Sequence, residues 1–297
     1  MKHLVAAENL AIAYPGGHIA LQDVSFALAP GETLGIVGES GSGKTTLIRQ
    51  FVNLPSSHAA VVAGRILFRD EDVAGLSAER WRQLRGGHIA MVFQNPGASL
   101  NPMLSVERQF VEAIRNHRNL SRKEARALAL EEIARLDLQD PPAILASRPW
   151  QLSGGMKQRV AIAIALAMDP ELILADEPTA ALDMSTQATV MAEFAERRRS
   201  RNAAIIVVSH NICACARIAD RLMVMRHGRV EDFDTTAAIF SRPADSYAGQ
   251  LLRAIPQLQA DRHGRDRPLN KTCWKSGIST KLFGSAAAVC RRCRTSP

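Results

Sequence analysis

Four short apolar runs recur along the chain, each bounded by polar or turn-forming residues. They cover residues 33–37, 89–93, 172–175 and 204–208. Short runs of β-branched and aliphatic residues are typical of buried strands. Because helical patterns separate these runs, we expect parallel strands joined by crossover helices.

Two other sections of the chain have patterns of their own. Up to about residue 30, apolar and polar positions alternate more strictly around Pro15, Gly16 and Gly17. This alternation predicts antiparallel strands at one side of the main sheet. From Asn95 to Trp150 the pattern becomes helical, which predicts an inserted helical subdomain over about 95–150.

One helix of this insert has a clear start. Ser121 and Glu124 have the spacing of a capping box, in which each side chain bonds the other residue's backbone N–H. The apolar residues that follow share one helical face, and they are Ala125, Leu128, Ala129, Ile133 and Leu136.

The hydrophobic periodicity fades after Leu258, so we predict a domain over 1–258 and a basic, weakly ordered tail over 259–297. The net charge of the 297-residue chain is +8, and the stretch from Asp261 to Pro297 carries +7 of it. The rest is nearly neutral, which gives no support for a nucleic-acid partner.

Composition indicates a globular protein, with 46% hydrophobic and 22% charged residues. The sequence contains no run of about 18 apolar residues, the length that a membrane-spanning helix needs. Glu8 and Asn9 interrupt the N-terminal stretch, which lacks the apolar core and cleavage site of a signal peptide. We therefore expect the protein to stay in the cytosol.

The five cysteines do not form the pattern of a disulfide framework. Cys213 and Cys215 lie in an apolar stretch, where we expect buried thiols. Cys273, Cys290 and Cys293 lie in the tail.

A phosphate-binding motif follows the first apolar run and precedes a helical pattern. It has the form G-x-x-x-x-G-K-[ST], whose backbone N–H groups and following helix N-terminus bind phosphate oxygens. Lys44 is expected to reach the β- and γ-phosphates, and the Thr45 hydroxyl to bind Mg²⁺. The motif and the next residue comprise Gly38, Glu39, Ser40, Gly41, Ser42, Gly43, Lys44, Thr45 and Thr46.

Two adjacent carboxylates, Asp176 and Glu177, end the third apolar run. The carboxyl end of a strand lies beside the phosphate-binding loop in such a sheet. We expect Asp176 to hold Mg²⁺ through its shell and Glu177 to orient or deprotonate the attacking water.

The stretch Leu-Ser-Gly-Gly-Met-Lys-Gln-Arg at 152–159 resembles the signature motif of ABC ATPases. Ser153, Gly154 and Gly155 precede an apolar helical run, so their hydroxyl and N–H groups are expected at a helix N-terminus, which favours anions. The resemblance implies that this end contacts the γ-phosphate bound by the other subunit of a head-to-tail dimer.

Other positions resemble family landmarks in the expected order. Tyr14 resembles the aromatic residue that stacks on adenine, and Gln94 the glutamine that senses Mg²⁺ and the membrane partner. Asp183 lies in a stretch that resembles the loop that communicates across the dimer. His210 resembles the histidine that contacts the γ-phosphate. Asn211 departs from the pattern, because family members often carry Asp there, and weaker electrostatic support for His210 is expected.

The resemblance covers residues 3–258 and implies an α/β fold. The expected P-loop NTPase core has a mainly parallel sheet, an antiparallel β subdomain and the helical insert. ATP and Mg²⁺ are the implied cofactors, with Lys44, Glu177 and His210 as catalytic residues. The implied metal ligands are Thr45, Gln94 and Asp176.

Several stretches resemble the oligopeptide, dipeptide and nickel importer branch, including 85–106, 151–167 and 239–256. An accessory ATPase of phosphonate breakdown is the first alternative. A DNA-repair or translation ATPase is the second, although such proteins carry long insertions or two ATPase domains, whereas 109 positions separate Lys44 from Ser153 here.

The branch also implies partners and a location. The expected partners are membrane permease subunits, a second ABC ATPase subunit and, indirectly, a solute-binding protein. The second subunit is expected to be a paralogue, with a homodimer as the alternative. Peripheral attachment at the cytoplasmic side of the inner membrane follows from these partners.

Some members of the branch hold an iron–sulfur cluster in a cysteine-bearing tail. Cys273, Cys290 and Cys293 supply three thiols, whereas such clusters usually take four ligands. We therefore favour a basic tail without a cluster.

Overall fold

A computed structural model describes residues 3–54, 59–94, 99–180 and 182–253. The chain divides into the units Met1–Ile255 and Pro256–Pro297, and the described residues lie in the first. The predictions about the basic tail and its three cysteines lie outside the described residues. The proposed domain limits and the limits of the helical insert stay predictions.

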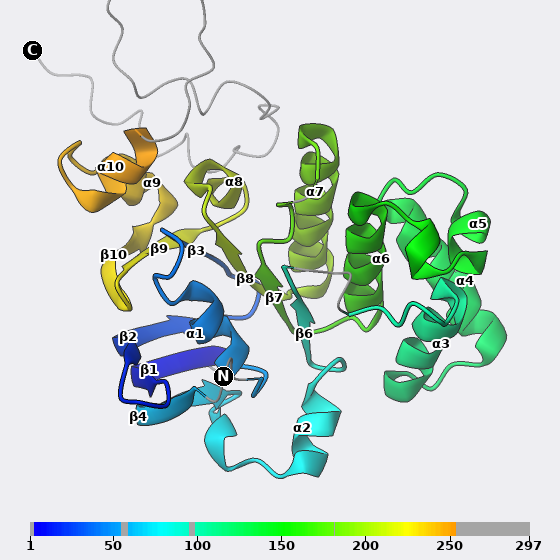
Figure 1. Ribbon diagram of the computed structural model, residues 1–297, viewed down its shortest axis with the longest axis horizontal. Coiled ribbons are helices and arrows are strands. Elements are labelled where there is room, and N and C mark those ends of the chain that lie inside the picture. Colours follow the sequence, from blue (N-terminus) through cyan, green and yellow to red (C-terminus); the bar gives the residue numbers. More distant parts are fainter. Residues whose placement is uncertain (1–2, 55–58, 95–98, 181, 254–297) are drawn as a thin grey trace, which may run out of the picture. The chain divides into compact units, whose positions relative to one another are not determined.

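A six-stranded sheet forms the centre of the first unit (Figure 1). Its order is β10-β9-β3-β8-β7-β6; the five strands from β9 to β6 run parallel, and β10 pairs with β9 in the antiparallel sense. The strands are β3 (Thr33–Gly38), β6 (Ile89–Val92), β7 (Leu172–Asp176), β8 (Ala204–Ser209), β9 (Arg221–Arg226) and β10 (Arg229–Thr235). The four predicted apolar runs are four of these strands, so the parallel arrangement is confirmed.

The central strands are apolar without interruption because both of their faces are buried. In β8, Ile205 and Val207 pack into one hydrophobic core, whereas Ile206 and Val208 pack into a second core on the opposite face. Side chains in a strand alternate between the faces, so one run of apolar residues supplies two cores.

The second core lies between this sheet and a four-stranded antiparallel sheet. That sheet has the order β2-β1-β4-β5, and its strands are β1 (Val5–Ala13), β2 (Ile19–Leu28), β4 (Ala60–Phe68) and β5 (Glu71–Asp72). Leu47, Ile48 and Phe51, from helix α1 (Lys44–Gln50) and its end, are buried in the same core. The predicted antiparallel strands at one side are therefore confirmed.

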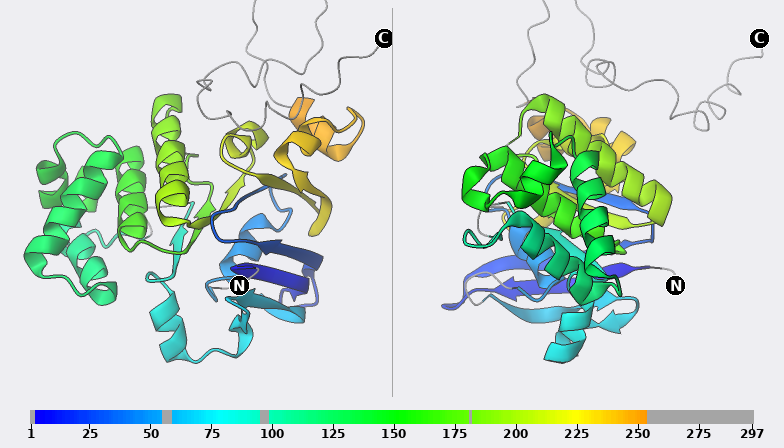
Figure 2. Two further views of the ribbon diagram at one scale, coloured as in Figure 1. Left: turned by 180° about the vertical axis from the view of Figure 1, so that it is seen from behind. Right: turned by 90° about the vertical axis from the view of Figure 1, so that its right-hand side faces the viewer.

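Helices cover the first core (Figures 1 and 2). The longer ones are α3 (Val106–His117), α4 (Arg122–Arg135), α6 (Gly154–Ala167) and α7 (Met184–Arg201). The others are α2 (Ala78–Leu84), α5 (Pro141–Ala146), α8 (Ile212–Ala216), α9 (Thr236–Phe240), α10 (Tyr247–Arg253) and the short turns η1 (Val73–Gly75) and η3 (Pro149–Gln151). No helix in the described part of the chain combines the length and apolar composition needed to cross a membrane.

Helix α4 begins as its sequence predicts. Ser121 accepts a hydrogen bond from the backbone N–H of Glu124, and the Glu124 carboxylate accepts one from the backbone N–H of Ser121. The expected apolar face is buried, with Leu128 only partly so.

The thiol prediction is half right. Cys215 is fully buried, and burial raises the pKa of its thiol to about 12. Cys213 is only half-buried, because neighbouring positions on a short helix face different surroundings.

A buried ionic cluster joins α4 to α7. The Arg197 guanidinium donates to Glu132 of α4 and, over 2.9 Å, to Glu193 of its own helix. These three residues are at most 8% exposed. Burial raises the pKa of Glu132, although its hydrogen bond with Arg197 acts in the opposite direction.

Replacing Arg197 by Ala removes the buried cation that contacts both carboxylates and leaves only the more exposed Arg135, 4.0 Å from Glu193, near them. We expect the free energy of unfolding, measured by urea titration at pH 7, to fall by about 3–5 kcal/mol. The matched control is Arg199→Ala, because Arg199 pairs with Glu196 on the exposed side of α7. Its expected change is within about 0.5 kcal/mol, and equal effects of the two substitutions would contradict this role of the buried cluster.

Candidate nucleotide site

The candidate site lies where four parallel strands end. The phosphate-binding motif follows β3, Gln94 follows β6, Glu177 follows β7 and His210 follows β8. The carboxyl ends of parallel strands share one edge of a sheet, which is the usual place for a ligand in this architecture. Residues that are up to about 170 positions apart in the sequence therefore meet.

The loop between β3 and α1 requires glycine at two places. Gly38 and Gly43 have φ angles of +152° and +97°. A Cβ atom on Gly38 would meet the backbone oxygen of Met225, and one on Gly43 would meet Leu21. The loop is thus packed closely against β9 and β2, and α1 begins directly after it at Lys44.

Lys44 is buried with its ammonium group inside this loop. Its Nζ donates to the backbone oxygens of Gly38 (2.9 Å) and Glu39 (2.6 Å). Burial lowers the pKa of Lys44, whereas the carboxylates of Glu177, Asp176 and Glu39 act to raise it. Three carboxylates therefore favour the charged ammonium form.

Thr45 and Asp176, the two predicted metal ligands closest to the phosphate loop, contact one another. The Thr45 hydroxyl donates to Oδ1 of Asp176 over 3.0 Å. The second carboxylate oxygen, Oδ2, is buried and has no hydrogen-bond partner among the described residues. Burial raises the pKa of Asp176, against the effects of Thr45, Arg49 and Lys44.

This arrangement fits Mg²⁺. A hydroxyl and an unsatisfied carboxylate oxygen are ligands of the kind that Mg²⁺ binds. Within the described ranges, no group of three or more His, Cys, Asp or Glu side chains could hold a metal. Mg²⁺ at Thr45 and Asp176 would therefore complete its shell with water and substrate phosphates.

Glu177 is held between two other predicted residues. The Gln94 side chain donates from Nε2 to Oε2 of Glu177 over 2.9 Å. The Nδ1 atom of His210 lies 3.4 Å from Oε1 of Glu177. Glu177 has a φ angle of +46°, an uncommon conformation for a residue with a side chain. Such strain is concentrated at functional sites.

Gln94 and Asn211 have structural details that the motifs did not specify. Strand β6 ends at Val92, so Gln94 lies two residues beyond the strand. Asn211 caps α8 by accepting a hydrogen bond from the backbone N–H of Ala214 over 3.2 Å. It therefore has a structural role of its own beside His210.

Tyr14 lies next to the phosphate loop. Its hydroxyl shares a hydrogen bond of 3.0 Å with the Thr46 hydroxyl, and its half-buried ring stacks on His18. The contact places an aromatic ring beside the first turn of α1. Stacking on adenine stays a prediction.

The signature residues lie at a separate helix end. Ser153 is the N-cap of α6 and accepts a hydrogen bond from the backbone N–H of Met156, and Gly154 and Gly155 form the first turn. Ser153 is exposed. Among the hydrogen bonds of the described residues, none joins this turn to the phosphate loop.

Asp183 lies at another helix N-terminus. Its carboxylate accepts hydrogen bonds from the backbone N–H (2.9 Å) and the hydroxyl (2.8 Å) of Thr186. The backbone hydrogen bond is the main reason why the pKa of Asp183 is lowered. Asp183 thus fixes the start of α7.

Two glutamines form hydrogen bonds with the segment after Glu177, and the sequence motifs gave neither of them a role. Gln158 of α6 donates to the backbone oxygen of Pro178, and Gln187 of α7 donates to those of Thr179 and Leu182. A glutamine inside an amphipathic helix carries no sequence signal for such a contact. Only the position of Gln158 within the signature motif could have drawn attention to it.

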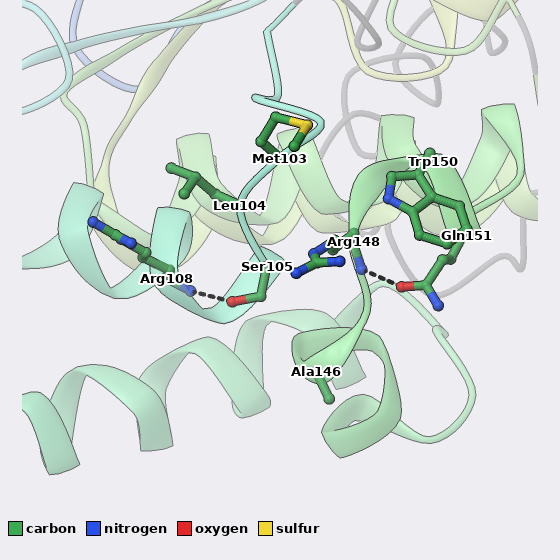
Figure 3. A pocket seen from close by; sticks show the side chains of 8 residues that line it. All are labelled: Met103, Leu104, Ser105, Arg108, Ala146, Arg148, Trp150 and Gln151. Carbon is green, nitrogen blue, oxygen red and sulfur yellow. Dashed lines mark hydrogen bonds between the residues drawn. The ribbon is translucent and has the colours of Figure 1, made fainter.

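Two hollows lie outside the group of residues described above, and the second of them reaches the end of β6 at Val92 and Phe93. One is polar and is lined by part of α3 and the segment before Ser153 (Figure 3). In it, Arg148 points toward Ser105, with Trp150 at the rim. The other is an apolar groove, and its lining includes Leu54, Met91, Phe93, Ile164, Ala165 and Met168.

Comparisons with known proteins agree with this geometry. The family described as "ABC transporter" matches residues 21–180. The dipeptide transport ATP-binding protein DppD of Bacillus subtilis (strain 168) is 39% identical over 262 residues, which is 87% of this chain and 78% of that protein. A putative peptide import ATP-binding protein of Brucella abortus (strain 2308) is 41% identical over 261 residues, covering 87% and 79%.

A solved structure of the ATP-binding cassette MJ0796, a dimer in a post-hydrolysis state with ADP and Pi, is also similar. It has a TM-score of 0.71 and 30% sequence identity, and the match covers 78% of this chain and 98% of that one. The predicted P-loop α/β fold is thus confirmed. On its sequence, its fold and the arrangement of its site, the chain belongs to the ABC transporter family.

Proposed function

We propose that this chain is the ATP-hydrolysing subunit of a membrane importer for peptides or related small solutes. The observation that carries the proposal is the convergence of Lys44, the Thr45–Asp176 pair and Glu177 at one edge of the sheet. The relatives named for dipeptide and peptide import support the class of cargo.

In this proposal the loop 38–43 and the start of α1 bind the phosphates of ATP. The Lys44 ammonium exchanges its contacts with Gly38 and Glu39 for the β- and γ-phosphate oxygens. Tyr14 stacks on the adenine ring. Thr45 and Asp176, with Gln94 nearby, would hold Mg²⁺, which would supply positive charge to the phosphates of ATP.

Glu177 is the group that acts on water. Its carboxylate accepts the hydrogen bond of Gln94 and faces His210, so these two contacts hold it close to the orientation that it needs. Glu177 orients the attacking water and takes up its proton, and His210 contacts the γ-phosphate. These roles require only small movements of side chains already at the strand ends.

Only half of the pocket comes from one chain. The Ser153 hydroxyl and the N–H groups of Gly154 and Gly155 form an exposed helix N-terminus suited to an anion. We assign it to the γ-phosphate of ATP held by a second ABC ATPase subunit, a paralogue or another copy. ATP then favours the closed dimer, with Asp183 at its contact, and hydrolysis reopens it.

The apolar groove supports a contact with the permease. Phe93 lines it, and the next residue, Gln94, donates to Glu177. A permease segment with apolar side chains bound there would lie one residue from a group that touches the catalytic carboxylate. The chain would then be peripheral at the cytoplasmic side of the membrane, with the solute-binding protein on the opposite side.

Replacing Glu177 by Gln keeps the shape and removes the base. We expect ATP binding to be retained and phosphate release by the assembled transporter to fall about 10²- to 10⁴-fold. The control is Glu196→Gln, a carboxylate on the exposed side of α7. Turnover at the wild-type rate in the Glu177 variant would refute the assignment.

Replacing Lys44 by Ala removes a charge-assisted contact to the phosphates. Such a hydrogen bond contributes about 1.5–3 kcal/mol, so the Kd of a fluorescent ATP analogue should rise about 10- to 150-fold. Lys123→Ala, an exposed change on α4, serves as the control. An unchanged Kd for the Lys44 variant would exclude this role.

A charge in the apolar groove should weaken attachment to the permease. We expect Leu54→Asp to stop co-sedimentation with membranes that contain the permease, while ATP binding persists, because Leu54 is 42% exposed in the groove. The control is Val62→Asp, on β4 and 60% exposed. If Leu54→Asp co-sedimented with these membranes to the same extent as Val62→Asp and the wild-type protein, the groove would not be the docking site.

A further inference from the structure

Ser153 and Gln158, at the N-terminal end of helix α6, lie little more than one turn apart. Ser153 caps the exposed N-terminus of the helix, and Gln158 is fully buried. A rise of 1.5 Å per residue separates the two positions by about 7.5 Å along the helix. The proposed function gives Ser153 a task in the other subunit's pocket and leaves Gln158 without one.

Gln158 holds the backbone next to the catalytic carboxylate. Its Nε2 atom donates to the carbonyl oxygen of Pro178, the residue directly after Glu177. On the other side, the backbone N–H of Glu177 donates to Val208 of β8 over 3.0 Å. The backbone around Glu177 is thus fixed on one side by the rigid sheet and on the other by α6.

A second helix holds the same segment farther along. Gln187 of α7 donates to the carbonyl oxygens of Thr179 (3.2 Å) and Leu182 (3.0 Å). Gln187 and Gln158 therefore make the same kind of contact, an amide group to a loop carbonyl. Helix α7 begins after Asp183, which is proposed for the dimer contact, but only α6 carries the helix end that is proposed to bind the other subunit's ATP.

We infer that Gln158 is a positioning residue that links the two ATP sites of the dimer. When Ser153 contacts the γ-phosphate of the other subunit's ATP, α6 shifts as a packed unit and Gln158 carries the shift to Pro178. The carboxylate of Glu177 in the same chain then reaches its hydrolytic orientation. This inference rests on the proposed function.

The size of the effect follows from geometry. Misplacing a reacting group by about 1 Å can cost 10²-fold in rate, and Glu177 is one residue from the contact. Loss of the Gln158 donor should therefore lower turnover and leave the ATP-binding loop of the same chain intact. It should also make ATP hydrolysis at one site depend less on ATP bound at the other site of the dimer.

The test uses the assembled transporter with Gln158→Met, which keeps the length and volume of the side chain and removes the donor. We expect kcat for ATP to fall about 10- to 100-fold, with ATP affinity within about twofold of wild type and a Hill coefficient close to one. The matched control, Gln187→Met, should lower kcat while the wild-type Hill coefficient persists.

Gln158→Glu covers the case in which the Met variant folds poorly. A buried carboxylic acid has a raised pKa, and its protonated form can donate to the Pro178 carbonyl. Turnover relative to wild type should therefore recover as the pH is lowered from 8 to 6. A role in packing alone would give no such recovery.

Three outcomes separate the claims. An active wild-type transporter whose kcat and Hill coefficient are unchanged in Gln158→Met overturns the inference and leaves the proposed function standing. An equal loss of cooperativity in Gln187→Met also overturns the inference. Any contact that holds the segment after Glu177 would then explain the cooperativity, without a special role for α6. A wild-type assembly without ATP hydrolysis refutes the proposed function itself.

Discussion

The parallel alignment of β3, β8, β7 and β6 is the constraint on which the site depends. Each strand is buried on both faces, so its polar groups can appear only where it ends. The phosphate loop, the carboxylate pair, His210 and Gln94 follow these ends. A slip of one residue in the register would exchange the two cores and separate the groups.

Burial of charge at this edge is part of the chemistry. Lys44 and Asp176 are both buried, which disfavours the ionised form of each, and each helps to offset that effect in the other. The unsatisfied Oδ2 of Asp176 and the strained backbone of Glu177 have a cost in the absence of ligand. Substrate phosphates and a divalent cation are groups that can offset this cost.

The sequence predicted the parts of this structure that depend on local pattern. The strands were found from their unbroken apolar runs, the start of α4 from Ser121 and Glu124, and the phosphate loop from its glycines and Lys44. Each of these is decided by residues within a few positions of one another.

Contacts across the chain could not be predicted in the same way. The order of motifs implied that Gln94, Glu177 and His210 belong to one site, but not that Glu177 accepts a hydrogen bond from Gln94 and lies beside His210. Gln158 and Arg197 are ordinary residues of helices, and their partners lie 20 and 65 positions away. Their roles depend on how helices pack on the sheet, which no local pattern records.

In the proposed function, this chain hydrolyses ATP and the hydrolysis drives solute import. The most direct test of this function is phosphate release by the chain assembled with its permease, second ATPase subunit and solute-binding protein in lipid vesicles. The account predicts hydrolysis that increases when the binding protein carries a peptide or related solute. The proposed function would be contradicted if the isolated chain hydrolysed ATP as fast as the assembled transporter, and if neither the permease nor the solute changed that rate.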